Sequence, residues 1–148
     1  MTIHGVGVDV ADARRIQRLL ERGGEAVALR WLGDPGTCGG GGREGDQAQA
    51  PGAGLPVRAL AECFAAKEAV WKALALPDWA GHVPWPWIDI RRDRSGVLTV
   101  TLSGPVAAAA ERAGAGHVDV AAHSRGHVAI AFAVVARLSA RRSPAPAP

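Results

Sequence analysis

Residues 2–10, TIHGVGVDV, alternate small and β-branched side chains, which is the period-two pattern of a β-strand. Val6, Val8 and Val10 fall on one face of this strand, so the glycines and Asp9 fall on the other. Because glycine has no side chain, the face that carries Asp9 leaves room for another group to approach the backbone. The stretch therefore predicts a first strand with a carboxylate on its closely approached face.

A helix is expected directly after this strand, with Asp12 as its N-cap and residues 13–22 as its body. Ile16, Leu19 and Leu20 form an apolar stripe at i, i+3, i+4 spacing. Three arginines, Arg14, Arg18 and Arg22, lie on the helix roughly opposite this apolar stripe, and Arg15 lies beside them. This face is either an ordinary solvated surface or a docking surface for an acidic partner. A second short helix is expected over residues 25–32.

A long helix is expected over residues 56–76, PVRALAECFAAKEAVWKALAL, because the stretch is rich in alanine and Pro77 ends it. Val57, Leu60, Phe64 and Trp71 share one face, and we expect this face to meet the sheet. Glu68 then lies at the edge of the buried face, with Lys72 one turn further on.

The remaining chain predicts mainly hairpins. Strands are expected over residues 87–91 and 97–102, a helix over 106–113, and strands over 117–122 and 127–136. Turns rather than crossovers join most successive strands, so the fold class is α+β, with an antiparallel sheet and a long packed helix. We expect one domain over residues 1–140, interrupted by a flexible glycine-rich insertion at about 33–54 and followed by a disordered tail over 141–148.

Composition narrows the function classes. The chain has 148 residues, 48% of them hydrophobic, and a net charge of only +3, which is too small an excess to indicate a nucleic-acid partner. No secretory signal and no membrane-spanning apolar run is visible, so we expect a cytoplasmic protein without a membrane partner. Cys38 and Cys63 show no CxxC spacing, which favours unpaired cysteines in a reducing compartment.

The candidate chemistry rests on three charged residues. Asp9, among valines, needs compensation either from a cation or from backbone N–H groups. Glu68 and Lys72 are either an exposed i, i+4 pair or a functional pair at the boundary of the core. Together, Asp9 and Glu68 could hold Mg²⁺, with Lys72 neutralising phosphate charge. A dinucleotide-binding fold is rejected, because a GxGxxG motif that starts at Gly5 requires glycine at residue 10, where this chain has valine.

Three segments resemble holo-acyl-carrier-protein synthases of the 4′-phosphopantetheinyl transferase superfamily. Residues 5–16, GVGVDVADARRI, resemble that family's opening GxGxDxxxxxRI. Residues 64–74, FAAKEAVWKAL, look like its second signature, FxxKEAxxKAL, and residues 121–131, AAHSRGHVAIA, are similar to its SxSHS hairpin. The segments occur in the family's order and cover the chain from the first strand to the last.

This resemblance implies the roles of individual residues. Asp9 and Glu68 match the magnesium-binding acids and, with Lys72, the catalytic group. Lys67 and Lys72 match phosphate-binding positions, and His123 and Ser124 match the part of the hairpin that contacts coenzyme A. The arginine face, Arg14, Arg15, Arg18 and Arg22, would dock the acidic helix of an apo carrier protein. Small members are homotrimers with active sites between subunits, so His123 would act across an interface.

The implied reaction moves the phosphopantetheine arm of coenzyme A onto a serine of an apo acyl or peptidyl carrier protein and releases adenosine 3′,5′-bisphosphate. Some positions depart from the pattern. Ala75-Leu76-Pro77-Asp78 replaces a Gly-Thr-Gly-like turn, and Ala121 and Ala122 replace the hairpin serines. Two alternatives therefore stay open: a non-catalytic or impaired relative that binds a carrier protein as an interaction subunit, and a generic anion-binding module that uses the basic helix.

Overall fold

The computed structural model describes residues 2–32, 57–76, 79 and 84–137. The predicted insertion at about 33–54 and the predicted tail at 141–148 lie outside these residues. Apart from the first helix, the described elements follow one another in the predicted order, and the α+β class is confirmed. They are β1 (Ile3–Asp12), α1 (Ala13–Leu32), α3 (Val57–Leu74), the 3₁₀ turn η1 (Trp85–Trp87), β2 (Ile88–Arg92), β3 (Leu98–Leu102), α4 (Gly104–Arg112), β4 (Ala115–Arg125) and β5 (Val128–Arg137).

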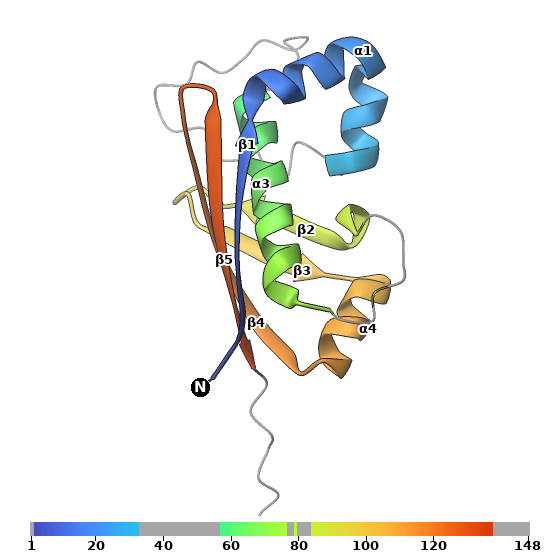
Figure 1. Ribbon diagram of the computed structural model, residues 1–148, viewed down its shortest axis with the longest axis vertical. Coiled ribbons are helices and arrows are strands. Elements are labelled where there is room, and N and C mark those ends of the chain that lie inside the picture. The colour runs from blue at the N-terminus through green and yellow to red at the C-terminus, as the bar shows by residue number, and fades with distance from the viewer. Residues whose placement is uncertain (1, 33–56, 77–78, 80–83, 138–148) are drawn as a thin grey trace, which may run out of the picture.

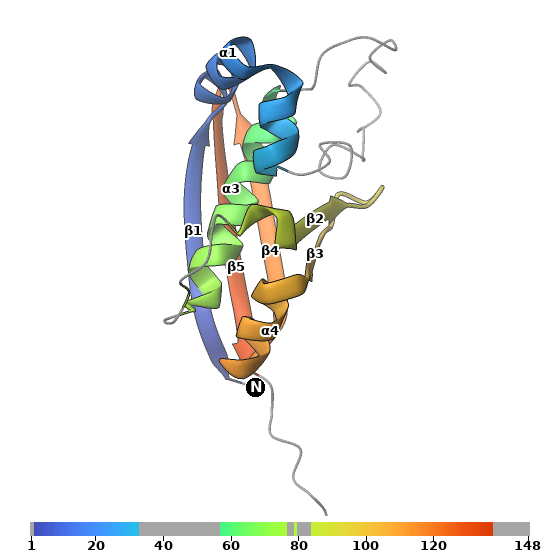
Figure 2. The same ribbon diagram turned by 90° about the vertical axis from the view of Figure 1, so that its right-hand side faces the viewer.

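The main sheet is three-stranded and antiparallel, in the order β1-β5-β4, and β2 pairs with β3 in a separate hairpin. The turn between β4 and β5 is tight, and Gly126 adopts a φ of 62° there, a conformation that glycine accepts without cost. Figures 1 and 2 show all the helices on one side of the sheet, with α3 running along it and the other side uncovered.

Helix α3 approaches the sheet through alanines. A Cβ atom added at Gly5 would lie 2.1 Å from the carbonyl oxygen of Ala73, and one added at Gly7 would lie 1.9 Å from that of Ala69. The two glycines are therefore required for this contact, as the predicted room on their face suggested. The expectation that Phe64 and Trp71 face the sheet is wrong, because only small side chains allow the two backbones to approach this closely.

The facing strand β5 contributes matching small residues. Ala131 pairs with Asp9 and Ala133 with Gly7 in the register, and both alanines are fully buried beneath α3. The alternate residues of β1 and β5 point to the uncovered side of the sheet. This side is apolar, and its exposed apolar residues are Val6, Val8, Val10, Val128, Ile130, Phe132 and Val134.

Helix α1 also differs from the prediction. It runs continuously from Ala13 to Leu32 rather than as two helices, with Gly23 and Gly24 inside it, and Figure 1 shows it bent near its middle. Paired glycines are a known cause of such bends. The predicted N-cap is confirmed, because the Asp12 carboxylate accepts a hydrogen bond of 2.9 Å from the backbone N–H of Arg14. None of the helices in the described part of the chain combines the length and apolar character needed to cross a bilayer.

Candidate active site at the β1–α3 contact

Asp9 and Lys72 form the centre of the candidate site. The Lys72 Nζ donates hydrogen bonds to Asp9 Oδ1 at 2.7 Å and to the carbonyl oxygen of Val8 at 3.1 Å. The Asp9 side chain is only 15% exposed, whereas that of Lys72 is 49% exposed. Its hydrogen bond to the Asp9 carboxylate raises the pKa of Lys72 above its usual value. Lys72 is therefore a charged ammonium with one end at the acid and a large part open to solvent.

Glu68 lies one turn before Lys72 on the same side of α3. Its partial burial raises the pKa of the Glu68 carboxyl, and repulsion from the nearby Asp9 carboxylate raises it further, while Lys72 opposes both effects. Two carboxylates that repel each other at a helix–strand contact are a suitable pair for a divalent cation. The structure thus brings Asp9, Glu68 and Lys72 together from segments about sixty residues apart in the chain.

Lys67 does not join this group. Its side chain is 3% exposed, and Nζ donates a hydrogen bond of 3.0 Å to the carbonyl oxygen of Trp85. Burial lowers the pKa of Lys67 to about 8. Successive helix residues point about 100° apart, so Lys67 faces η1 while Glu68 faces the site. Its predicted role in phosphate binding receives no support from this geometry.

The two carboxylates fit a magnesium ion that takes some of its ligands from the protein and the rest from a substrate. Among the described residues, no three or more His, Cys, Asp or Glu side chains come together in a group that could hold a metal ion by themselves. Magnesium is usually held by one or two carboxylates, with phosphate oxygens and water completing the coordination. Asp9 and Glu68 could supply these two carboxylates, although Asp9 is paired with Lys72 in the structure.

The residues around this site match one family. The model of the 4′-phosphopantetheinyl transferase superfamily matches residues 5–133, which include both signatures and the hairpin. The chain belongs to this superfamily. The resemblance, the fold class and the enzyme class predicted from the sequence are therefore confirmed.

Individual relatives agree with this assignment. A holo-[acyl-carrier-protein] synthase of Micrococcus luteus is 36% identical over 97% of this chain and 99% of its own length. The crystal structure of the holo-[acyl-carrier-protein] synthase of Neisseria meningitidis superimposes with a TM-score of 0.68 at 31% identity, covering 92% of this chain and 100% of that one. The Helicobacter pylori synthase in complex with coenzyme A shares the fold, with a TM-score of 0.64 at 21% identity, over 88% of this chain and 99% of that one.

The hairpin residues of the family pattern lie apart from the acids. His123 pairs with Ile130 on β5, and its exposed side chain lies on the uncovered side of the sheet, opposite to the face that carries Asp9. Ser124 is partly buried on the helix side, where its carbonyl oxygen accepts a long hydrogen bond of 3.5 Å from Arg58. Within one chain, therefore, neither residue joins the Asp9 cluster.

The arginine face of α1 is largely formed as predicted. Arg15, Arg18 and Arg22 are exposed, whereas Arg14 holds Asp12 in an ion pair of 2.9 Å. The hydrogen bonds from Arg14 lower the pKa of Asp12 to about 2. The predicted apolar stripe opposite is partly wrong, because Leu19 is exposed while Ile16 is buried.

The turn after α3 keeps the conformation that the family's glycine would favour. Ala75 has a φ of 46°, the left-handed conformation that commonly ends a helix. The preceding carbonyl oxygen, that of Leu74, is 2.9 Å from Nε2 of His4. Ala75 thus adopts a conformation that glycine accepts more readily, and sequence patterns gave no sign of the contact with His4.

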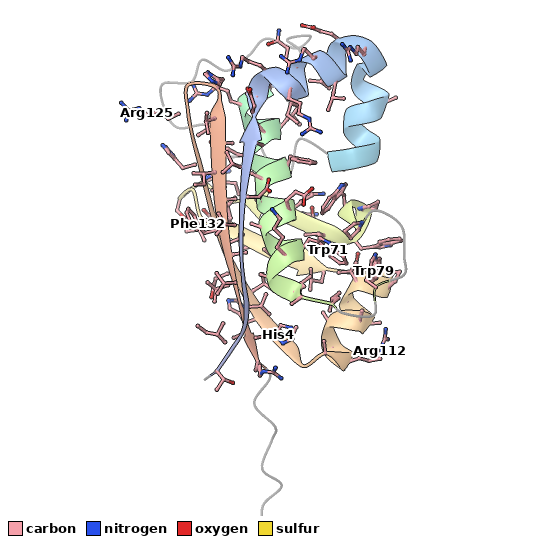
Figure 3. All side chains as sticks on the ribbon, in the orientation of Figure 1. His4, Trp71, Trp79, Arg112, Arg125 and Phe132 are labelled. Atoms are coloured by element: carbon pink, nitrogen blue, oxygen red, sulfur yellow. The ribbon has the colours of Figure 1, made fainter. Side chains whose placement is uncertain are left out.

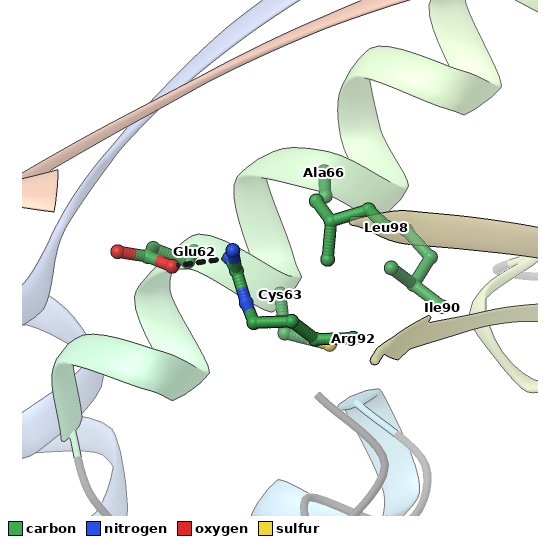
Figure 4. A pocket seen from close by; sticks show the side chains of 6 residues that line it. All are labelled: Glu62, Cys63, Ala66, Ile90, Arg92 and Leu98. Carbon is green, nitrogen blue, oxygen red and sulfur yellow. Dashed lines mark hydrogen bonds and ion pairs between the residues drawn. The ribbon is translucent and has the colours of Figure 1, made fainter. Parts of the chain in front are cut away.

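A small pocket lies on the far side of α3, under the β2–β3 hairpin. Glu62 and Arg92 form an ion pair of 2.7 Å at its edge (Figure 4), and the space has room for about one water molecule. Its wall includes Cys63, which is disulfide-bonded, so the expectation of an unpaired cysteine is wrong at this position. The pocket is too small for a nucleotide and is separate from the Asp9 cluster.

Proposed function

We propose that this chain transfers the 4′-phosphopantetheine group of coenzyme A to a serine hydroxyl of an apo acyl or peptidyl carrier protein. The proposal rests on one observation: Asp9, Glu68 and Lys72 meet at the β1–α3 contact of a chain that belongs to the phosphopantetheinyl transferase superfamily. Its relatives are holo-[acyl-carrier-protein] synthases, which supports the carrier protein as the acceptor.

The reaction is a phosphoryl transfer. The serine oxygen forms a bond to the phosphorus that carries pantetheine, the bond from that phosphorus to the bridging oxygen breaks, and adenosine 3′,5′-bisphosphate leaves. Asp9 and Glu68 would hold Mg²⁺, which when bound neutralises charge on the pyrophosphate and the leaving group.

The protein groups have distinct tasks in this scheme. Lys72 can exchange Asp9 for a phosphate oxygen, because about half of its side chain is exposed. Glu68, or a water beside it, accepts the serine proton, and the raised pKa of its carboxyl, caused by burial and by repulsion from Asp9, makes it a stronger proton acceptor. The exposed arginines of α1 would dock the acidic carrier protein, and their long-range attraction would mainly speed association.

We also propose a homotrimer with its active sites between subunits. The uncovered side of the sheet carries seven exposed apolar side chains of β1 and β5, among them Phe132 at 50% exposure. Contiguous apolar patches of this kind usually mark interfaces. His123 lies on this same side, so assembly through it would carry His123 to a neighbouring subunit, where it could contact coenzyme A. The cytoplasmic location expected from the sequence stays a prediction.

The test is to incubate the protein with coenzyme A, Mg²⁺ and several apo carrier proteins, and to measure the mass added to each carrier. We expect a phosphopantetheine adduct with at least one carrier, and its loss in Glu68→Gln with the fold intact. The rival function, a non-catalytic carrier-binding subunit, is favoured by Ala122, which stands where the pattern has the serine before the hairpin histidine. Measurable carrier binding without transfer to any carrier would exclude the enzyme and support that rival.

A further inference from the structure

Three tryptophans form an aromatic ladder beside the candidate active site. Trp71 and Trp79 pack edge to face, with ring centroids 5.3 Å apart, and Trp79 and Trp87 do the same at 6.1 Å. All three side chains are only partly buried. Figure 3 shows Trp71 and Trp79 together on the side of α3 that is turned away from the sheet.

The ladder begins at the site itself. Trp71 follows Glu68 by three residues and directly precedes Lys72, so one helical turn separates its Cα from that of the acid. The sheet side of α3 is occupied by alanines, which leaves Trp71, Glu68 and Lys72 on the accessible side. A flat molecule with phosphates at Lys72 would therefore have aromatic surface within reach.

The ladder differs from the other aromatic contact of this region. Trp85 packs against Phe64, with ring centroids 6.0 Å apart, and is only 6% exposed, as expected for a ring that serves the core. Trp71, Trp79 and Trp87 also pack against the core and on one another, yet each keeps part of its surface exposed. Aromatic rings left at the rim of a charged site are well suited to bind the π-face of a base.

We propose that the Trp71–Trp79–Trp87 ladder binds the purine base of the nucleotide substrate while Lys72 and the acids take its pyrophosphate. This inference rests on the proposed function, since it assigns a base-binding surface to the same site. It adds Trp71 as a residue that positions the substrate through its base, next to the residues that act on the phosphates.

The test compares coenzyme A with two ligands that each carry only one part of it. Binding of coenzyme A, adenosine 3′,5′-bisphosphate and 4′-phosphopantetheine is measured by calorimetry for the wild type, Trp71→Ala and Trp71→Phe. We expect Trp71→Ala to weaken binding of the two adenine-containing ligands by roughly tenfold and to leave 4′-phosphopantetheine unchanged. Trp71→Phe should retain most of the affinity, because it keeps a ring for stacking.

Tryptophan fluorescence gives a second readout that needs no catalysis. Adenosine 3′,5′-bisphosphate should quench the wild type, and the quenching should be markedly smaller in Trp71→Phe. The matched control is Trp85→Phe, which removes the same chromophore from the core and should keep the quenching. Melting temperatures of all variants establish that each one is folded.

Several outcomes would overturn the inference. One is equal affinity of the wild type and Trp71→Ala for every ligand, and another is an equal loss for 4′-phosphopantetheine, which would place the arm rather than the base on the ladder. Absence of any bisphosphate binding by the wild type would also overturn it. A wild type that binds the bisphosphate but transfers nothing would count against the proposed function alone, and the Trp71 comparison would still decide the inference.

Discussion

The two faces of β1 behave in opposite ways. On one face, Gly5 and Gly7 lie against the backbone carbonyls of α3, and Asp9 is held by Lys72. On the other face, Val6, Val8 and Val10 are exposed although their side chains are apolar. The first face is completed within one chain, whereas the second is left without a cover in the described chain. The comparison indicates that the meeting of Asp9 with Lys72 needs only the fold of one chain, while the proposed role of His123 needs a second subunit.

We call the face of β1 with Gly5, Gly7 and Asp9, which packs on α3, the closed face, and the opposite face with Val6, Val8 and Val10 the open face. The largest expected effect comes from adding a side-chain atom on the closed face. Gly7→Ala places a Cβ atom 1.9 Å from the carbonyl oxygen of Ala69, which belongs to a helix backbone that has little freedom to move. We expect the free energy of unfolding to fall by at least about 3 kcal/mol, measured by denaturant titration. Val8→Ala, the next residue on the open face, is the matched control and should cost less than about 1.5 kcal/mol. Similar losses at both positions would remove the distinction between the faces.

The next prediction tests the open face. Phe132→Asp places a charge at the middle of the uncovered apolar side, so we expect a trimeric wild type to become monomeric while its helical circular dichroism signal is kept. Sedimentation or mass photometry measures the change. Val97→Asp, which alters another exposed apolar residue outside this sheet, should leave the assembly unchanged. A monomeric wild type, or an assembled Phe132→Asp variant, would contradict the proposed interface.

A smaller effect is expected at the end of α3. Ala75 adopts a φ of 46°, which costs an L-residue about 1 kcal/mol relative to glycine. Ala75→Gly should therefore stabilise the protein by about 1 kcal/mol and raise its melting temperature by a few degrees. Ala59→Gly lies inside the same helix and should have the opposite sign, a loss of roughly 0.5–1 kcal/mol. Destabilisation by both substitutions would show that the turn does not carry the expected strain.

The smallest expected effect concerns the acid at the edge of the closed face. The raised pKa of Glu68 means that its protonated form is favoured in the folded state, so stability is lost as the pH rises through that pKa. In the presence of EDTA, Glu68→Gln should melt slightly above the wild type at pH 7, and the difference should shrink toward pH 4. Glu62→Gln should instead destabilise the protein, because it leaves Arg92 without its ion-pair partner at 2.7 Å. A Glu68→Gln variant that melts below the wild type at pH 7 would contradict this assignment.

Sequence patterns predicted the order of elements, the two faces of β1 and the antiparallel hairpins, because each depends on local periodicity. They also predicted the residues that meet at Asp9, through matches in separate segments. They did not predict which side of α3 meets the sheet, since an apolar stripe is usually buried and the deciding factor here is the close fit of alanine to glycine across distant segments. The burial of Lys67 was missed for a related reason. It depends on the rotation of α3 relative to η1, which the local sequence around Lys67 does not determine. Trp71 was assigned only to a packing face, although its spacing from Glu68 was a usable signal.

The positions of Lys67 and Lys72 have a practical consequence. They are the only lysines in the chain, and Lys67 is 3% exposed while the side chain of Lys72 is 49% exposed. Amine-reactive dyes, biotin esters and cross-linkers will therefore find a single accessible side-chain amine, and it belongs to the candidate active site. Routine labelling or surface immobilisation through lysine would block Lys72 itself, whereas protection of Lys72 from such a reagent would report occupancy of the site without any carrier protein present.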